Sequence, residues 1–295
     1  MILNVSGRTD IVAFYSEWFL NRYKEGFLDV RNPFYPKQVS RISFEDVDTI
    51  LFCTKNPIPI VSRLQEINKP ILFQITLTPY KNDIEPNVPS KAAIIEAIKK
   101  VSEIIGIENT YVRYDPIYLS KKYSVEYHMK AFCKMCELLD GYIRHIIVSF
   151  IDDYKNVRKN MSTLNFRDFS ESDYEKIGLS FSKYANDHGM TVQTCFEDRR
   201  LIEYGFVNQD CITKELASRL TGKTSFRRWK SRKENKCDCV EMVDIGVYNS
   251  CNHLCKYCYA NYDEEKVLSN MMKHNKGSSL LIGELEIDDI IKIRS

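Results

Sequence analysis

The sequence predicts an α/β fold built as a parallel β/α barrel, TIM-like and either complete or partial. Short apolar strands alternate with amphipathic helices along most of the chain, and this alternation is typical of a parallel sheet. Roughly seven or eight such units favour a barrel over an open sheet. The 295 residues contain no repeat, low-complexity tract or Gly/Ser/Pro-rich linker. We therefore expect a single domain spanning residues 1–295.

Hydrophobic periodicity places the elements in order. A strand at 2–5 runs into Ser6-Gly7-Arg8-Thr9-Asp10 and a helix at 11–25. Extended segments at 27–30 and 38–42 form a less regular second unit, interrupted by prolines. Further strands are expected at 49–52, 71–77, 110–114, 143–150, 190–194 and 242–247. Helices are expected at 58–67, after the capping residue Ser90, and at 124–139, 171–187 and 213–221.

The composition is that of a soluble globular protein, with 44% hydrophobic residues, 28% charged residues and a net charge of +2. It gives no overall preference for nucleic acid or membrane. The N-terminus lacks the basic and apolar regions of a signal peptide, and no apolar run is long enough to span a bilayer. Ten cysteines in such a chain indicate metal ligation in a reducing cytoplasm rather than disulfides.

Cys251, Cys255 and Cys258 stand close together in a loop at 248–262 that follows the strand at 242–247. Their C-x3-C-x2-C spacing lets three thiolates surround one metal centre, and soft sulfur ligands select iron–sulfur or zinc. A structural zinc normally has four protein ligands, whereas three cysteines on a four-iron cluster leave one iron open. A zinc knuckle completed by another cysteine remains the alternative.

Polar residues follow the predicted strands repeatedly, where the catalytic groups of β/α barrels lie. Lys55, Arg113 and Asp115 are our candidate catalytic residues, and Asn56 stands beside the first of them. Any one of these side chains could instead cap a helix or end a strand. Their recurrence along one expected rim, which also receives the cysteine loop, favours a functional site.

A second group of cysteines, Cys195, Cys211, Cys237 and Cys239, is expected near the same rim. It could hold a second [4Fe–4S] cluster or a zinc ion, and buried thiols without a ligand are the alternative. Between them, 223–236 is strongly basic and carries two aromatic residues. Such a segment can bind nucleic acid or a phosphate group, but a solvated loop is the more common case.

The triad, with Tyr257 just before its last cysteine, resembles the signature of the radical S-adenosylmethionine (SAM) enzymes. In that superfamily SAM chelates the open iron, and its reductive cleavage yields a 5′-deoxyadenosyl radical that abstracts hydrogen from a substrate. Their cluster loop usually follows the first barrel strand. Here it lies near the C-terminus, so the resemblance implies a circularly permuted barrel or an appended domain. The strand at 242–247 reads as one more barrel strand, which favours the permutation.

The resemblance also implies a SAM site. The strand that follows the cluster helix would then be the first strand of this chain, and the turn after it would bind the SAM amino and carboxylate groups. Our candidate cofactor-binding residues are Ser6, Gly7, Arg8, Asp10, Asn56 and Tyr257. Gly283 and Glu284, downstream of the cluster, are the alternative for the amino group. A reductant such as flavodoxin or ferredoxin and a small-molecule or modified macromolecular substrate are the expected partners.

Four sequence stretches together resemble the domain-of-unknown-function family 1848: Ser-Gly-Arg-Thr-Asp-Ile, Thr-Lys-Asn-Pro, Arg-Tyr-Asp-Pro-Ile and the C-terminal cysteine segment. Cys53 stands where that family leads us to expect a bulky aromatic residue. The family implies no reaction. We therefore expect a cytoplasmic radical SAM enzyme of unassigned substrate. A zinc protein that is structural or binds nucleic acid, and an iron–sulfur electron-transfer protein, are the competing interpretations.

Overall fold

The structure is a computed structural model and describes residues 1–294 except 153–156, 158–159, 195–198 and 230–238. Its strands are β1 Ile2–Val5, β2 Phe27–Arg31, β3 Gln38–Ser43, β4 Thr49–Thr54, β5 Ile71–Thr76, β6 Thr110–Ile117, β7 His145–Phe150, β8 Thr191–Thr194, β9 Met242–Asp244 and β10 Ile290–Arg294. Its α-helices are α1 Ile11–Phe14, α2 Ser16–Glu25, α3 Ile58–Val61, α4 Lys91–Ile105, α5 Val125–Leu138, α7 Met161–Leu164, α8 Glu171–Asp187, α9 Lys214–Thr221 and α10 Glu264–Met272.

Seven strands form one parallel sheet in the order β8-β7-β6-β5-β4-β1-β9. The C-terminal strand β9 pairs with the N-terminal strand β1, with Met242–Asp244 beside Ile2–Asn4. The expectation that the last strand joins the same sheet is therefore confirmed. Within the described residues no pairing joins the edge strands β8 and β9, so the fold is a mixed α/β fold with a seven-stranded parallel sheet, and closure into a barrel is not observed.

The segments expected as an irregular second unit form a separate three-stranded sheet instead. β2 and β3 are an antiparallel hairpin, and β10 pairs with β3 in parallel. The reason is the short connection between β2 and β3, since a parallel neighbour requires a crossover of a dozen residues or more. The hairpin turn is fixed by the Asn32 side chain, which accepts a hydrogen bond from the Phe34 amide at 2.9 Å.

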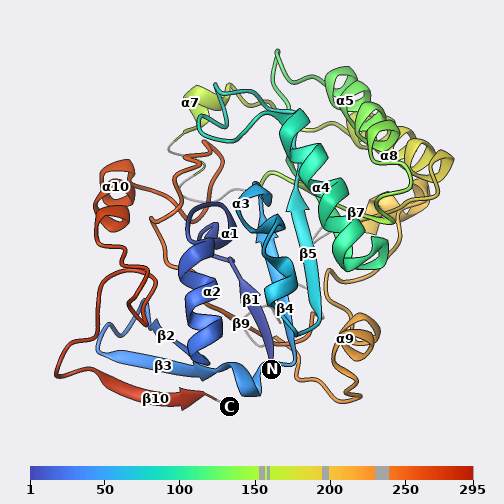
Figure 1. The fold of residues 1–295 in the computed structure, drawn as a ribbon. Coiled ribbons are helices and arrows are strands. Elements are labelled where there is room, and N and C mark those ends of the chain that lie inside the picture. The colour runs from blue at the N-terminus through green and yellow to red at the C-terminus, as the bar shows by residue number, and fades with distance from the viewer. Residues whose placement is uncertain (153–156, 158–159, 195–198, 230–238, 295) are drawn as a thin grey trace.

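One face of the large sheet packs against helices. Alternate residues along the strands, such as Leu3, Ile50 and Phe73, are fully or almost fully buried in a core shared with α1, α2, α4, α5 and α8. Figure 1 shows α2 and α4 lying across the strands on this face. The alternation follows from the two-residue period of a strand, which sends neighbouring side chains to opposite faces.

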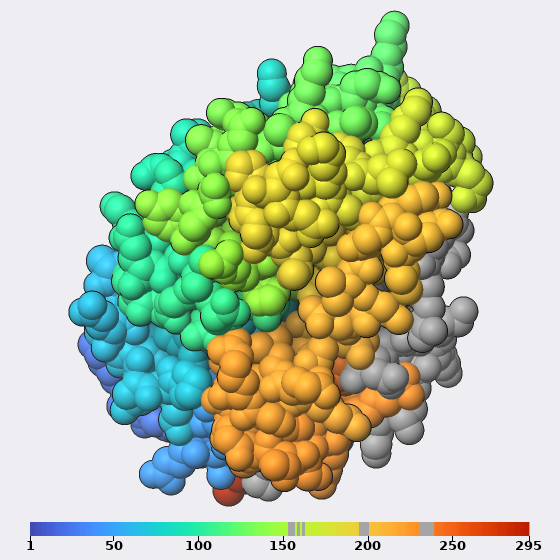
Figure 2. Space-filling model, turned by 90° about the vertical axis from the view of Figure 1, so that its right-hand side faces the viewer, coloured from blue at the N-terminus to red at the C-terminus, as the bar shows by residue number. Residues whose placement is uncertain are grey.

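The opposite face is apolar at one end and polar at the other. Near the beginnings of the strands, Ile2, Leu51 and Leu72 pack against the segment around α9, through residues that include Ile212 and Leu220. In Figure 2 this segment, coloured orange, forms the lower part of the visible surface. Towards the carboxyl ends of the strands, the residues on this same face become polar: Asn4, Cys53, Gln74 and Arg113. This change positions a polar interior next to the cysteine loop.

Several element boundaries differ from those expected. The helix expected at 11–25 is divided at Tyr15 into α1 and α2, and the helix expected at 58–67 is reduced to α3 and a 3₁₀ turn at Leu64–Glu66. β6 continues through Asp115-Pro116 rather than ending there. β9 stops at Asp244, because its carboxylate accepts the Gly246 amide at 3.0 Å and turns the chain.

Candidate metal centre

The cysteine loop is tied together at its base. Asn249, in a left-handed conformation with φ 52°, donates its amide to the Ala260 carbonyl at 3.1 Å. Its side-chain oxygen accepts the Tyr262 amide at 2.9 Å. Asparagine tolerates this backbone region better than most residues. The ends of the loop are therefore joined, and the three cysteines lie between them.

The three thiols are removed from water. Cys251 and Cys255 are buried and Cys258 is half-buried. Burial raises the pKa of Cys251, and the charges of Asp10, Cys258 and Cys255 raise it further. Burial likewise raises the pKa of Cys255 and of Cys258. Without a cation these groups are neutral thiols, and a metal centre would supply the charge that makes them thiolates.

The three cysteines are soft ligands of the kind that an iron–sulfur cluster or a zinc ion uses. In the part of the chain that the structure describes, no group of three or more His, Cys, Asp or Glu side chains is arranged to hold a metal ion. A four-iron cluster requires a wider ligand spacing than a single ion, because each cysteine sulfur binds a different iron. Cys251, Cys255 and Cys258 match it in number and in soft-ligand chemistry.

The turn that follows β5 holds the cysteine loop from one side. The Lys256 amide donates to the Ile84 carbonyl at 2.9 Å, and the Asn87 side chain donates to the Asn252 carbonyl at 2.7 Å. Tyr257, between the last two cysteines, donates its hydroxyl to the Glu85 carboxylate. This turn therefore contacts the loop at three residues: Asn252, Lys256 and Tyr257.

Glu85 is the centre of a buried charge network. Its carboxylate accepts hydrogen bonds from Lys55 at 2.9 Å, from Thr78 at 2.6 Å and from Lys91. Burial alone would raise its pKa, but the two lysines lower the pKa of Glu85 to about 2. Burial opposes the charge of Lys55 as well, yet Glu85 outweighs burial and raises the Lys55 pKa. These pKa shifts favour the charged forms of Glu85 and Lys55, whereas burial and the neighbouring Lys55 lower the pKa of Lys91.

The turn after β1 holds the loop from the other side. Asp10 caps α1 by accepting the Ala13 amide at 2.9 Å. It also accepts hydrogen bonds from Thr54 and the Lys55 amide, each at 2.8 Å. His253 of the cysteine loop, 2% exposed, hydrogen-bonds Asp10 through Nε2 at 3.0 Å. Asp10 therefore joins β1, β4 and the loop, and both of its oxygens are already engaged.

Arg8 and Gly7 lie against the end of β9. The Arg8 guanidinium forms an ion pair with Asp244 at 2.6 Å, and the Gly7 amide donates to the same carboxylate at 2.8 Å. A Cβ on Gly7 would lie 2.9 Å from the Asp244 carboxyl carbon, which is too close for any other residue without displacement. Glycine at this position lets the two neighbouring strand ends approach each other.

The candidate catalytic residues also lie near the loop. Arg113 pairs with Asp115 at 2.6 Å and donates to the Gln74 side-chain oxygen at 3.1 Å. Burial would raise the pKa of Asp115, but Arg113 and Ser149 lower it. Lys55 lies 5.3 Å from the centre of the Tyr257 ring in the cysteine loop. The structure therefore places Lys55 against the loop, and a role for Arg113 and Asp115 in the same site stays a prediction.

Other predicted residues have local roles. Ser6 accepts the Ile11 amide at 2.8 Å, and Asn56 accepts the Ile58 amide at 3.2 Å, so each stabilises the start of a helix. Glu284 contacts Asn275 and, through its carbonyl, Arg31 near the three-stranded sheet. Binding of SAM by any of these residues stays a prediction.

The second cysteine group can be followed only in part, because Cys195 and Cys237 lie outside the described residues. Cys211 and Cys239 are buried together in the core beneath α9, and their segments are joined by a bond from the Val240 amide to the Ile212 carbonyl at 3.2 Å. Arg113 reaches Cys211 at 3.8 Å. Metal binding by this group remains untested.

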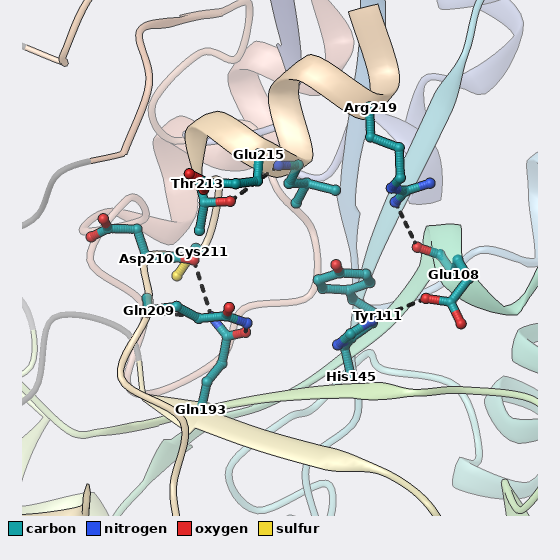
Figure 3. A pocket seen from close by; sticks show the side chains of 11 residues that line it. Glu108, Tyr111, His145, Gln193, Gln209, Asp210, Cys211, Thr213, Glu215 and Arg219 are labelled. Atoms are coloured by element: carbon teal, nitrogen blue, oxygen red, sulfur yellow. Dashed lines mark hydrogen bonds and ion pairs between the residues drawn. The ribbon is translucent and has the colours of Figure 1, made fainter.

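A cavity of about 260 Å³ lies between α9 and the beginnings of β6 and β7. Figure 3 shows Tyr111 and His145 on its floor, with Glu108 and Arg219 on one wall and Cys211 on the other side. Most of its lining comes from the segment 209–219, with Tyr111 and His145 from near the beginnings of β6 and β7, whereas the cysteine loop follows a strand end. Among the predicted site residues that the structure describes, only Cys211 lines this cavity.

Sequence reasoning missed Glu85, Lys91 and Asn87. Glu85 and Asn87 lie in a polar stretch between β5 and α4, and Lys91 is the first residue of α4; their spacing carries no ligand or catalytic pattern. His253 also carries no sequence signal for its contact, and its side chain is buried against Asp10. The one available signal was position, since this stretch follows a strand end, where β/α proteins concentrate functional groups.

No helix in the described portion of the chain is both long and apolar enough to cross a bilayer. The described architecture is that of a parallel α/β protein whose cysteine loop and buried charges meet at the carboxyl edge of the sheet. The chain belongs to the family described as a domain of unknown function (DUF1848), whose model matches residues 2–260. No curated protein matches the chain.

Proposed function

We propose that this protein is a radical SAM enzyme that uses Cys251, Cys255 and Cys258 as the ligands of a [4Fe–4S] cluster. The observation that carries the proposal is the C-x3-C-x2-C loop itself, which follows β9 and packs against the turns after β1 and β5. Three soft ligands of this kind leave one iron of a four-iron cluster without a protein ligand.

The strand order supports a permuted, partial barrel. β9, which precedes the cysteine loop, pairs with β1, the first strand of the chain. If the chain were renumbered to begin at β9, the sheet would run β9-β1-β4-β5-β6-β7-β8, and every step would join a strand to its next parallel neighbour. The cluster loop would then follow the first strand, as it usually does in radical SAM enzymes.

With SAM bound to the open iron, one electron from the reduced cluster would cleave the C5′–S bond to give methionine and a 5′-deoxyadenosyl radical. The protein's own residues would bind and orient SAM and the substrate and would exclude water from the radical. Arg8 and the turn after β1 would orient the amino-acid end of SAM. Lys55, Arg113 and Asp115, each only slightly exposed, would face the substrate. A cytoplasmic flavodoxin or ferredoxin would supply the electron.

The test is anaerobic reconstitution with iron and sulfide, then incubation with dithionite and SAM, with 5′-deoxyadenosine measured by mass spectrometry. Wild type should bind iron and sulfide and form 5′-deoxyadenosine, and Cys255→Ala should do neither. Cys133→Ala, which removes a half-buried thiol on α5, is the matched control and should resemble wild type.

Other outcomes separate the competing interpretations. A colourless protein that retains zinc would overturn the proposal in favour of a zinc site. A stable, redox-active iron–sulfur protein that never cleaves SAM would indicate electron transfer.

A further inference from the structure

The buried network beside the cysteine loop carries an excess positive charge. It contains two lysines, Lys55 and Lys91, and one carboxylate, Glu85. The Glu85 side chain is 1% exposed, the Lys55 side chain 14% and the Lys91 side chain 32%. Because the single carboxylate is shared by two ammonium groups, one positive charge is left uncompensated within the network.

This charge lies against the segment between two of the cysteines. The Lys55 ammonium lies 5.3 Å from the centre of the Tyr257 ring, and the Tyr257 hydroxyl donates to Glu85. Tyr257 stands between Cys255 and Cys258 in the sequence. Lys55 therefore lies against the segment that joins two of the predicted ligands.

The other carboxylates near the loop have partners of their own. Asp10, on the other side of the loop, accepts four hydrogen bonds, one of them from His253. Asp115 is paired with Arg113, and Asp244 with Arg8. The Lys55–Glu85–Lys91 group is thus the described network near the loop with more cations than anions.

A nearby positive charge changes the redox chemistry of an iron–sulfur cluster. Reduction adds one negative charge, and a cation in a poorly solvated site stabilises the reduced form more than the oxidised form. Net charge, hydrogen bonding and solvent exposure are the means by which proteins set cluster potentials. Removal of the cation should therefore make the cluster harder to reduce.

We propose that Lys55 and Lys91, held in place by Glu85, raise the reduction potential of the cluster bound by Cys251, Cys255 and Cys258. The inference rests on the proposed function, because it requires that cluster. It assigns to Lys55 an electrostatic role that operates before any substrate binds. Lys91 has the same role from a more exposed position.

The test is a potentiometric titration of the reconstituted protein, without SAM, with dithionite as the one-electron reductant and the reduced cluster followed by electron paramagnetic resonance. Lys55→Met should shift the midpoint to a more negative potential. Lys91→Met should shift it in the same direction by a smaller amount. Lys55→Arg keeps the charge and should stay near wild type, as should Lys81→Met, which removes an exposed lysine from the same turn.

Salt distinguishes a buried charge from a general surface effect. Charges in a buried network are screened much less than exposed ones, so the shift in Lys55→Met should persist at high potassium chloride. If Lys55→Met cannot assemble a cluster, the comparison of Lys91→Met with Lys81→Met still decides the question.

Equal midpoints for wild type, Lys55→Met and Lys91→Met, with intact cluster spectra, would overturn this inference and leave the proposed function standing. A shift to more positive potential in the lysine variants would overturn it as well. If wild type assembles no iron–sulfur cluster, the proposed function fails first and this inference fails with it.

Discussion

Glu85 shows how a single side chain can organise a site without being one of its ligands. Its carboxylate bonds to Lys55, the residue after β4, to Lys91 of α4 and to Tyr257 of the cysteine loop. A buried carboxylate is costly unless it is paired and hydrogen-bonded. Here the two lysines, Thr78 and Tyr257 provide those partners, so removal of the carboxylate would leave two partly buried cations without their shared counter-charge.

Glu85→Gln should lower the free energy of unfolding by about 3 kcal/mol at neutral pH, because breaking a buried ion pair costs about 3–5 kcal/mol. The folded-state pKa of Glu85 is lowered to about 2, below the unfolded value of about 4.3. Its stabilisation is therefore complete above about pH 4.3 and is lost as the pH falls towards 2.

Urea unfolding of the metal-free protein across this range checks the prediction. The difference in stability between wild type and Glu85→Gln should narrow as the pH falls from about 4.3 to 2. Glu96→Gln, which removes an exposed carboxylate from α4, serves as the control and should change stability little at any pH. A constant difference between wild type and Glu85→Gln would contradict the assignment.

At the scale of elements, the regular helices and strands were predictable because each carries its own signal. α5 and α8 begin after Ser124 and Ser170, whose side chains accept backbone amides of the first turn, as capping preferences predict. α8 matches its expected range of 171–187. The broken helix at Tyr15 was not predictable, because its apolar spacing is continuous and the Tyr15 hydroxyl bonds to the distant Ser250 carbonyl.

The positions of the candidate residues could be predicted from the sequence, but the residues that hold the cysteine loop in place could not. The cysteines are a local pattern. Lys55 follows β4, and Arg113 and Asp115 lie in the second half of β6, two strands that sequence periodicity identifies. Glu85 and Asn87 contact residues 172 and 165 positions away. Pairings over such distances depend on how the turns meet in space, which a local pattern does not encode.

The turn after β5 should control how firmly the cysteine loop is held. Asn87→Ala removes the bond to the Asn252 carbonyl, and a hydrogen bond of this kind contributes about 1 kcal/mol. Amides in the loop at 249–262 should therefore exchange with solvent about fivefold faster in the metal-free protein. Hydrogen exchange followed by mass spectrometry measures this.

Asn82→Ala is the matched control, because Asn82 bonds to Pro86 within the same turn. It should leave exchange in the cysteine loop unchanged. Equal protection of the loop in Asn87→Ala and wild type would mean that this side-chain bond does not hold the loop.

At the scale of the whole molecule, the C-terminal part of the chain completes both sheets. β9 is added to β1 at the edge of the large sheet, and β10 to β3 in the small one. The two additions differ in burial: Val243 of β9 is 7% exposed, whereas every residue from Ile290 to Arg294 is exposed. We therefore expect their contributions to stability and to the site to differ.

Removal of residues 290–295 should cost only about 1 kcal/mol of unfolding free energy, since little apolar surface is lost with β10. Val243→Ala should cost about 1–3 kcal/mol, because it leaves a cavity in the main core. Chemical denaturation measures both. The truncated protein should bind as much iron and sulfide as wild type, and a loss of iron binding would show that β10 supports the cysteine loop.

The pairing of β9 with β1 also has a consequence for how the protein is made. Gly7 and Asp244, which bond to each other, are separated by 237 positions. At typical synthesis rates of about 5–20 residues per second, the ribosome would need roughly 10–50 seconds to add the second partner after the first. Throughout that interval the edge of β1 that later pairs with β9 is uncovered, and Asp10 cannot form its hydrogen bond with His253. The nascent chain therefore has a long period in which premature association with other chains is the hazard, and the proposed iron–sulfur cluster could be inserted only at the end of it.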